Sequence, residues 1–150
     1  MKFKWVILVI GTYLIAFSIN LFPSMKHPDS MMNISHLLAT LLFLFGFLIF
    51  INKSPQNGKF DKVIKLSLIL GILSGLIVFV IGMFEGALSN HLILELMTAI
   101  QYPSYFLFIT PWFGLNQIFD LNYQLFSLIV SVVYLFLLIL NFKKTNHQPA

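Results

Sequence analysis

The stretch QYPSYFLFITPWFGLNQ, residues 101–117, decides the fold, because it is an apolar run that also carries prolines and polar side chains. Pro103, Ser104 and Pro111 interrupt a row of aromatic and aliphatic residues, and a glutamine stands at each end. Such a segment can cross a lipid bilayer, lie along it, or enter it and return to the same side. Which of these occurs fixes the side of the membrane on which the C-terminus lies.

The composition of the chain is that of a membrane protein. Of 150 residues, 59% are hydrophobic and 9% are charged, whereas an ordinary soluble domain has about 45–50% and about 25%. A water-soluble fold of this size cannot bury so much apolar surface, but a bilayer accepts helices of about 20 apolar residues whose backbone hydrogen bonds close internally. We therefore expect an all-α, polytopic transmembrane helical bundle that forms a single domain over residues 1–150.

Four apolar runs are long enough to cross a bilayer and lie between polar, turn-forming stretches. They cover about residues 5–22, 34–51, 63–84 and 123–142. A signal peptide is the competing interpretation of the first run, but its apolar character continues beyond the small-residue site at Ala16 and Ser18. We interpret the first run as a retained span.

The segment 92–113 is also long enough to cross, but its polar residues and prolines oppose insertion. On insertion scales, a central polar or charged residue costs up to about 2.5–3.5 kcal/mol, whereas each Leu, Ile or Phe contributes about 0.3–0.6 kcal/mol in favour. The sum lies near zero, so the segment needs help from neighbouring helices. We favour a crossing and hence five spans, with four spans plus a re-entrant or interfacial segment at 92–113 as the alternative.

Lysine positions give a second test of the topology, because cytoplasmic loops carry an excess of basic residues. With the N-terminus inside, five spans place six lysines inside and three outside, whereas a segment that fails to cross gives eight inside and one outside. The eight-to-one distribution agrees better with the excess of basic residues expected inside, but the first spans usually dominate orientation. We keep five spans, in a cytoplasmic membrane with a cytoplasmic N-terminus. Lysine without arginine and abundant phenylalanine are typical of an AT-rich bacterium.

Polar side chains share one helical face of the segment 92–113 and the residue before it. At 100° per residue, five polar positions fall within about 80° of one another. They are His91, Glu95, Thr98, Tyr102 and Tyr105. Lipid does not accept such a face, so we expect it to turn inward, toward other helices or a wet cavity. An ionisable residue at or inside a membrane boundary, as Glu95 would be, is a functional-site hypothesis by default.

Several groups able to relay protons or bind a metal lie toward the outer side in the five-span orientation. His27 and Asp29 are among them, and the candidate polar or ion site comprises His36, Glu85, His91, Glu95, Thr98 and Tyr102. No spacing among these residues is a known metal motif. The alternative is that they are ordinary loop and interface residues. We expect no resident metal and no cofactor.

A stripe of small residues follows the span 63–84. Ser67, Gly71 and Gly75 lie at intervals of four residues, which lets two helix backbones approach closely in lipid. This helix-packing stripe fits either a contact within the bundle or a contact with a partner. We favour the contact within the bundle.

The sequence contains no phosphate-binding glycine loop, no His-Glu-x-x-His motif and no readable pair of nucleophile and base. We therefore expect a non-enzymatic membrane protein that acts through helix association, as an accessory subunit or a homo-oligomer. Its expected partners are the lipid bilayer and other membrane helices. Nucleic acid is not among them, because the lysines cluster at span ends and form no basic face. The alternative is a small transporter or ion-conducting protein with a polar pathway around Glu95 and His36.

Overall fold

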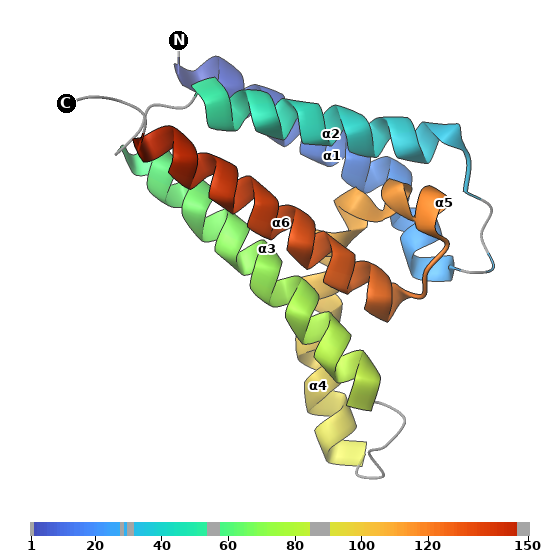
Figure 1. Cartoon of the computed structure of the whole chain (residues 1–150). Helices are drawn as coiled ribbons and strands as arrows, with labels where there is room; N and C mark the ends of the chain where they lie inside the picture. The colour runs from blue at the N-terminus through green and yellow to red at the C-terminus, as the bar shows by residue number, and fades with distance from the viewer. Residues whose placement is uncertain (1, 28, 30–31, 54–57, 85–90, 147–150) are drawn as a thin grey trace.

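The computed structural model describes residues 2–27, 29, 32–53, 58–84 and 91–146 (Figure 1). Over these residues the chain is helical and contains no strand, so the prediction of an all-α fold is confirmed. The elements, in order, are α1 (Lys2–Lys26), α2 (Ile34–Lys53), α3 (Lys59–Phe84), α4 (His91–Ser104), the π-helix η1 (Tyr105–Ile109), the 3-10 helix η2 (Thr110–Leu115), α5 (Asn116–Phe119) and α6 (Tyr123–Asn146).

Helices α1, α2, α3 and α6 are long and apolar enough to cross a membrane. The shortest of them, α2, has 20 residues, and at about 1.5 Å per residue this length spans a hydrocarbon core about 30 Å thick. Large apolar side chains such as Ile7, Phe45 and Phe136 are exposed on the outside of these helices. Lipid is the solvent in which such a surface is stable, so the four helices indicate a membrane protein.

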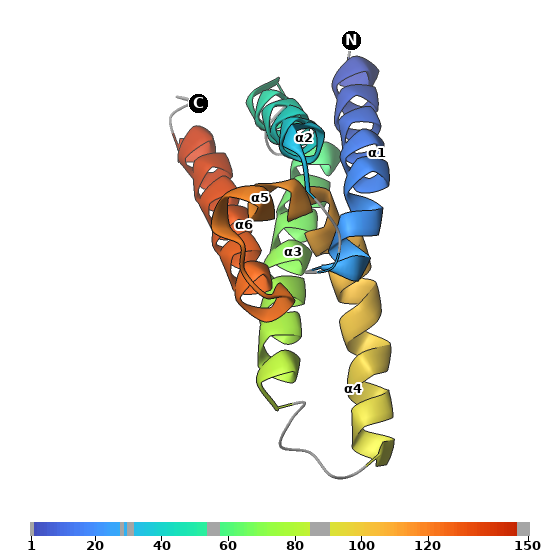
Figure 2. The same ribbon diagram turned by 90° about the vertical axis from the view of Figure 1, so that its right-hand side faces the viewer.

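The long helices form two pairs that are closest at one end of the molecule. Helix α1 packs against α2, and α3 packs against α6 (Figure 1). At the narrow end, Lys144 Nζ donates a hydrogen bond to the carbonyl oxygen of Ile51 at 2.7 Å, and Lys65 Nζ lies over the Phe142 ring. Toward the other end the two pairs separate, and the chain from η1 to α5 lies between them (Figures 1 and 2).

The segment expected to form the fifth span is not one continuous helix. After α4, the N–H of Thr110 bonds to the carbonyl of Tyr105, five residues back, and the chain then tightens into the 3-10 turns of η2. Pro111 contributes to this break, because it has no N–H to donate to the carbonyl four residues before it, that of Leu107. A count of five spans is therefore not confirmed.

Hydroxyl groups from two neighbouring helices supply donors to the carbonyls at the break. Tyr13 Oη of α1 donates to the carbonyl oxygen of Leu107 at 3.0 Å. Tyr134 Oη of α6 donates to the carbonyl oxygen of Phe108 at 2.9 Å. An irregular backbone at membrane depth is tolerated only where protein or water satisfies it, and here two tyrosines of the same chain do so.

A buried polar cluster formed by α1 and α2 donates hydrogen bonds to a third carbonyl of the break, that of Pro111. Asn20 Nδ2 and Thr40 Oγ1 both donate to the carbonyl oxygen of Pro111, at 3.2 Å and 3.1 Å. The same Asn20 amide donates to Thr40 Oγ1 at 2.9 Å. Both side chains are fully buried, so their polarity serves the backbone of η2 and is not presented to lipid.

Helix η2 also packs very closely against the first turns of α2. A Cβ added to Gly114 would lie 1.9 Å from the carbonyl oxygen of His36 and 2.5 Å from Thr40 Oγ1. Real side chains cannot occupy that space, so glycine is required at this contact. The neighbouring Trp112 and Phe113 are completely buried and fill the space between the two helix pairs.

The hydrogen bond from Tyr134 to the broken backbone can be tested by removing one hydroxyl. In Tyr134→Phe the ring stays, but the Phe108 carbonyl loses its donor. We expect the free energy of unfolding to fall by about 1–2 kcal/mol, measured by SDS titration in mixed micelles. Tyr102→Phe is the control, since this ring is 70% exposed, and it should change the value by less than about 0.5 kcal/mol. Equal effects of the two substitutions would contradict the role given to Tyr134.

Candidate functional site

A cavity of about 770 Å³ lies between the end of α1, the end of α4 with η1, and the start of α6. Its volume falls in the range of about 300–1,000 Å³ that is usual for small-molecule sites. The polar side chains of its lining are Ser24, His27, Gln101, Tyr102, Tyr105 and Tyr123. The residues that line it on α1 lie at the C-terminal end of that helix, where Lys26 is the last residue, and the other lysines lie elsewhere.

Hydrogen bonds to Ser24 fix the inner wall of the cavity. Tyr105 Oη donates to the carbonyl oxygen of Ser24 at 3.0 Å. Ser24 Oγ donates to the carbonyl oxygen of Leu21 at 2.9 Å and lies 3.3 Å from Thr110 Oγ1. The Tyr105 ring also meets the Tyr123 ring edge-on. The π-helix is therefore tied to α1 and packs against α6, and the cavity between them has a defined shape.

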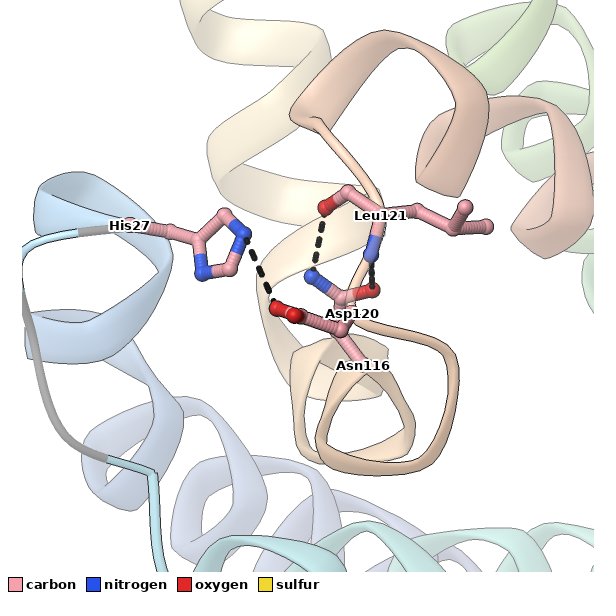
Figure 3. Close-up of polar contacts among 4 residues, drawn as sticks. All are labelled: His27, Asn116, Asp120 and Leu121. Carbon is pink, nitrogen blue, oxygen red and sulfur yellow. Dashed lines mark hydrogen bonds and ion pairs between the residues drawn. The ribbon is translucent and has the colours of Figure 1, made fainter.

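A clamped turn lies beside this wall (Figure 3). The Asn116 side chain accepts a hydrogen bond from the N–H of Leu121 at 3.0 Å and donates one to its carbonyl oxygen at 2.8 Å. Between them, Asp120 has the left-handed backbone conformation, with φ of 46°, which aspartate tolerates better than most residues. The clamp holds the Asp120 carboxylate 4.0 Å from His27 Nε2.

The electrostatic contribution of this pair is small, because the Asp120 side chain is 91% exposed and water screens the interaction. The His27 side chain is only 12% exposed, and its ring meets the Phe113 ring edge-on. Burial and the contact with Phe113 therefore contribute more than the ion pair to the position of the imidazole at the edge of the cavity.

The residues predicted as a polar or ion site are not gathered in one place. Glu85 lies outside the described residues, as does the side chain of His91. His36 is in the first turn of α2, where its Nδ1 accepts a hydrogen bond from the N–H of Asn33 at 3.0 Å. Within the described ranges, no hydrogen bond or ion pair connects His36 with α4. Over the same ranges, no cluster of three or more His, Asp or Glu side chains could hold a metal ion.

The polar face of α4 does not turn inward as a whole. Glu95 is exposed, and Tyr102 is 70% exposed at the rim of the cavity. Thr98 donates its hydroxyl to the carbonyl oxygen of Glu95 at 2.9 Å, within its own helix. The more buried side of α4 carries Met97, Thr98 and Gln101, and this leaves Glu95 on the outside. The expected inward orientation of Glu95 is therefore wrong within this chain.

The stripe of small residues on α3 faces α6. A Cβ on Gly71 would lie 2.7 Å from the Tyr134 ring, and a Cβ on Gly75 would lie 2.2 Å from Ser131 Oγ. Ser67 is half-buried and lines a smaller hollow bounded by α1, α2 and α6. Gly71 and Gly75 are thus covered by a helix of the same chain.

Of the polar residues that line the cavity, only Tyr102 belongs to the predicted candidate site. His27 was singled out among the groups toward the outer side and Tyr105 on the polar face, whereas Ser24 and Gln101 were missed. Asp120 was also missed, although an Asn and an Asp four residues apart in a short connection are a signal of turn chemistry. Sequence spacing within one segment does not reveal a site that two distant segments form together.

Comparisons with protein-family models, with curated proteins and with solved structures find no match to this chain.

Gly75 allows a test of the contact between α3 and α6. Gly75→Ala places a methyl group 2.5 Å from the carbonyl oxygen of Ser127, and we expect overpacking to lower the free energy of unfolding by about 1–3 kcal/mol. Gly11→Ala is the matched control, because nothing lies within 4 Å of its added Cβ. It should be neutral or stabilise by up to about 1 kcal/mol. SDS titration measures both, and a destabilisation limited to Gly11→Ala would refute the contact.

Proposed function

We propose that the chain is a multi-pass protein of a bacterial cytoplasmic membrane, with four spans and a re-entrant segment that runs from α4 to α5. The buried break at η1 and η2 supports this topology, because its carbonyls receive donors from α1, α2 and α6. The segment enters between the two helix pairs and turns back within protein, which is the condition under which irregular backbone is tolerated in a membrane.

The distribution of lysines supports the same topology and indicates which end of the molecule is cytoplasmic. The end of α6 lies beside the end of α2, so the C-terminal lysines share one end of the molecule with the other basic helix ends. That end carries Lys2, Lys4, Lys53, Lys59, Lys62, Lys65, Lys143 and Lys144, and Lys26 is at the other end. The positive-inside rule then makes the lysine-rich end, with the N-terminus, cytoplasmic.

Single cysteines distinguish this topology from five spans, because the chain has no native cysteine. In Lys4→Cys and Lys143→Cys, a membrane-impermeant maleimide should label only from the cytoplasmic side. In Ile118→Cys, which replaces a side chain that is 62% exposed, it should label only from the outside. Five spans would instead put residue 118 on the side of residue 4, and residue 143 on the opposite side.

We propose that the protein is non-enzymatic and acts through helix association, as an accessory or oligomeric membrane component. The exposed face of α4 is the single observation that carries this proposal. There Glu95 stands between Leu92 and Leu96, which are 66% and 61% exposed. Lipid disfavours the Glu95 carboxylate, and water disfavours the neighbouring leucines. A partner helix that offers a hydrogen-bond donor would satisfy the carboxylate and cover the leucines. The stripe on α3 is less suitable, because α6 covers Gly71 and Gly75.

A small transporter or ion-conducting protein with a pathway around Glu95 and His36 is the second candidate. The observation that favours it is the broken helix at η1 and η2, since transporters form their sites at discontinuous helices near the membrane midplane. The donors at this break are engaged with backbone carbonyls. These donors are therefore not free to bind an ion or a substrate, which is why we place this candidate second.

Crosslinking through α4 tests the association in native membranes. A cysteine in Leu96→Cys, on the exposed face of α4, should be joined to a second polypeptide by a short bis-maleimide. A cysteine in Leu135→Cys, on α6 and 46% exposed, should not. Adding Glu95→Gln to the first variant should reduce the crosslinked fraction, because a neutral amide oxygen is a weaker acceptor than a carboxylate. Monomer alone from both cysteines would contradict the proposal.

The second candidate is distinguished by flux of protons or ions in proteoliposomes. A flux present in the native chain and lost in Glu95→Gln, together with monomer alone in the crosslinking, would favour transport over association.

A further inference from the structure

The inner part of the cavity offers hydrogen-bonding capacity that the protein does not use itself. Gln101 is 6% exposed and lines the cavity, and no hydrogen bond joins its amide to another residue of the described chain. Its amide atoms are not among the fully enclosed ones that lack a partner, so they are accessible from the cavity that Gln101 lines. The hydroxyl of Tyr105, by contrast, is engaged with Ser24. Among the polar side chains of the lining, Gln101 is thus a largely buried one whose amide remains available to a bound molecule. The fully enclosed atoms without a partner in the described chain, Asn20 Oδ1, Trp112 Nε1 and Gln117 Oε1, do not belong to this lining.

The outer part of the cavity is apolar. Met25, Phe106 and Leu107 line it and are 69%, 39% and 49% exposed. They belong to the end of α1 and to the π-helix, where the surface of a membrane-embedded chain meets acyl chains. A molecule that placed a polar group against Gln101 would therefore extend an apolar tail over these three side chains into the bilayer. The gradient from polar to apolar fits an amphiphile.

The charges around the cavity favour an uncharged head group. His27 is the ionisable side chain of the lining that carries a positive charge when protonated, and the Asp120 carboxylate already lies 4.0 Å from it. No lysine of the described chain is among the lining residues. Lys26, the nearest in sequence, is exposed, and its Nζ lies 4.9 Å from the centre of the Phe22 ring. A phosphate head group would enter without a dedicated cation, which is costly in a poorly solvated site.

We propose that this cavity binds an uncharged membrane lipid whose head group carries carbonyl oxygens, with the Gln101 amide as a donor and the tail lying over Phe106 and Leu107. Ester carbonyls of a glyceride and ring carbonyls of an isoprenoid quinone share this chemistry. Aromatic side chains of the lining, such as Tyr105 and Tyr123, give either head group a flat surface to pack on. This site is independent of the proposed association through α4.

Photo-crosslinking with the full chain in phosphatidylcholine nanodiscs tests the site. The two probes are a diacylglycerol and an isoprenoid quinone, each with a diazirine on its tail. For at least one probe, we expect crosslinks at Met25, Phe106 or Leu107, located by mass spectrometry. Excess unlabelled lipid of the same kind should abolish them, whereas phosphatidylglycerol should not compete. Which probe reacts identifies the source of the carbonyl head group.

Two variants and a control make the test specific. Leu107→Trp fills the outer part of the cavity and should remove the crosslinks. Leu135→Trp, at a leucine of similar exposure on α6, should leave them unchanged. Gln101→Leu should weaken competition by the unlabelled lipid roughly fivefold, the effect of one hydrogen bond. The SDS unfolding midpoint of each variant shows that it is folded.

Three results would overturn the proposal. Crosslinks spread evenly over the lipid-facing helices, or crosslinks that persist in folded Leu107→Trp, would mean that no defined site exists. Competition by phosphatidylglycerol as strong as that by the uncharged lipid would mean that the head group is not selected for lack of charge. None of these results bears on the crosslinking through α4, so the two proposals fail separately.

Discussion

A buried peptide carbonyl needs a hydrogen-bond donor, and this requirement organises the chain around the carbonyls of Leu107, Phe108 and Pro111. Their donors come from three of the four long helices, because α1, α2 and α6 each contribute polar side chains that donate to the break. Asn20 and Thr40 are therefore not isolated polar residues within apolar spans. They keep a proline-containing segment between two helix pairs, and the separation of the pairs follows from the volume of that segment.

The composition and the apolar runs were sufficient to predict an all-helical membrane protein, because lipid imposes a length and an apolar character that can be read residue by residue. The course of the segment 92–113 was not predictable in the same way. Its insertion energy lies near zero, so neighbours decide the outcome. The deciding contacts, such as Tyr134 with Phe108 and Gly114 with His36, join residues far apart in the sequence.

The candidate site was harder to predict than the fold. Helical periodicity grouped Glu95, Thr98 and Tyr102 on one face, but periodicity does not state which side of α4 packs on α3. The small-residue interval on α3 was more informative, since Gly71 and Gly75 do mark a close approach of two helices. The cavity could not be predicted from the sequence, because its walls come from α1, α4, η1 and α6. No single segment carries a residue pattern that indicates it.

The order in which the donors are synthesised has a consequence for biogenesis. Tyr13, Asn20 and Thr40 precede the break in the chain, so their helices are already in place when residues 107–111 leave the ribosome. Tyr134 follows the break and arrives only with the last helix. Until then the carbonyl of Phe108 lacks the donor that Tyr134 supplies in the folded protein. Release into lipid before α6 is made would expose that carbonyl, so closure of the bundle depends on the arrival of α6.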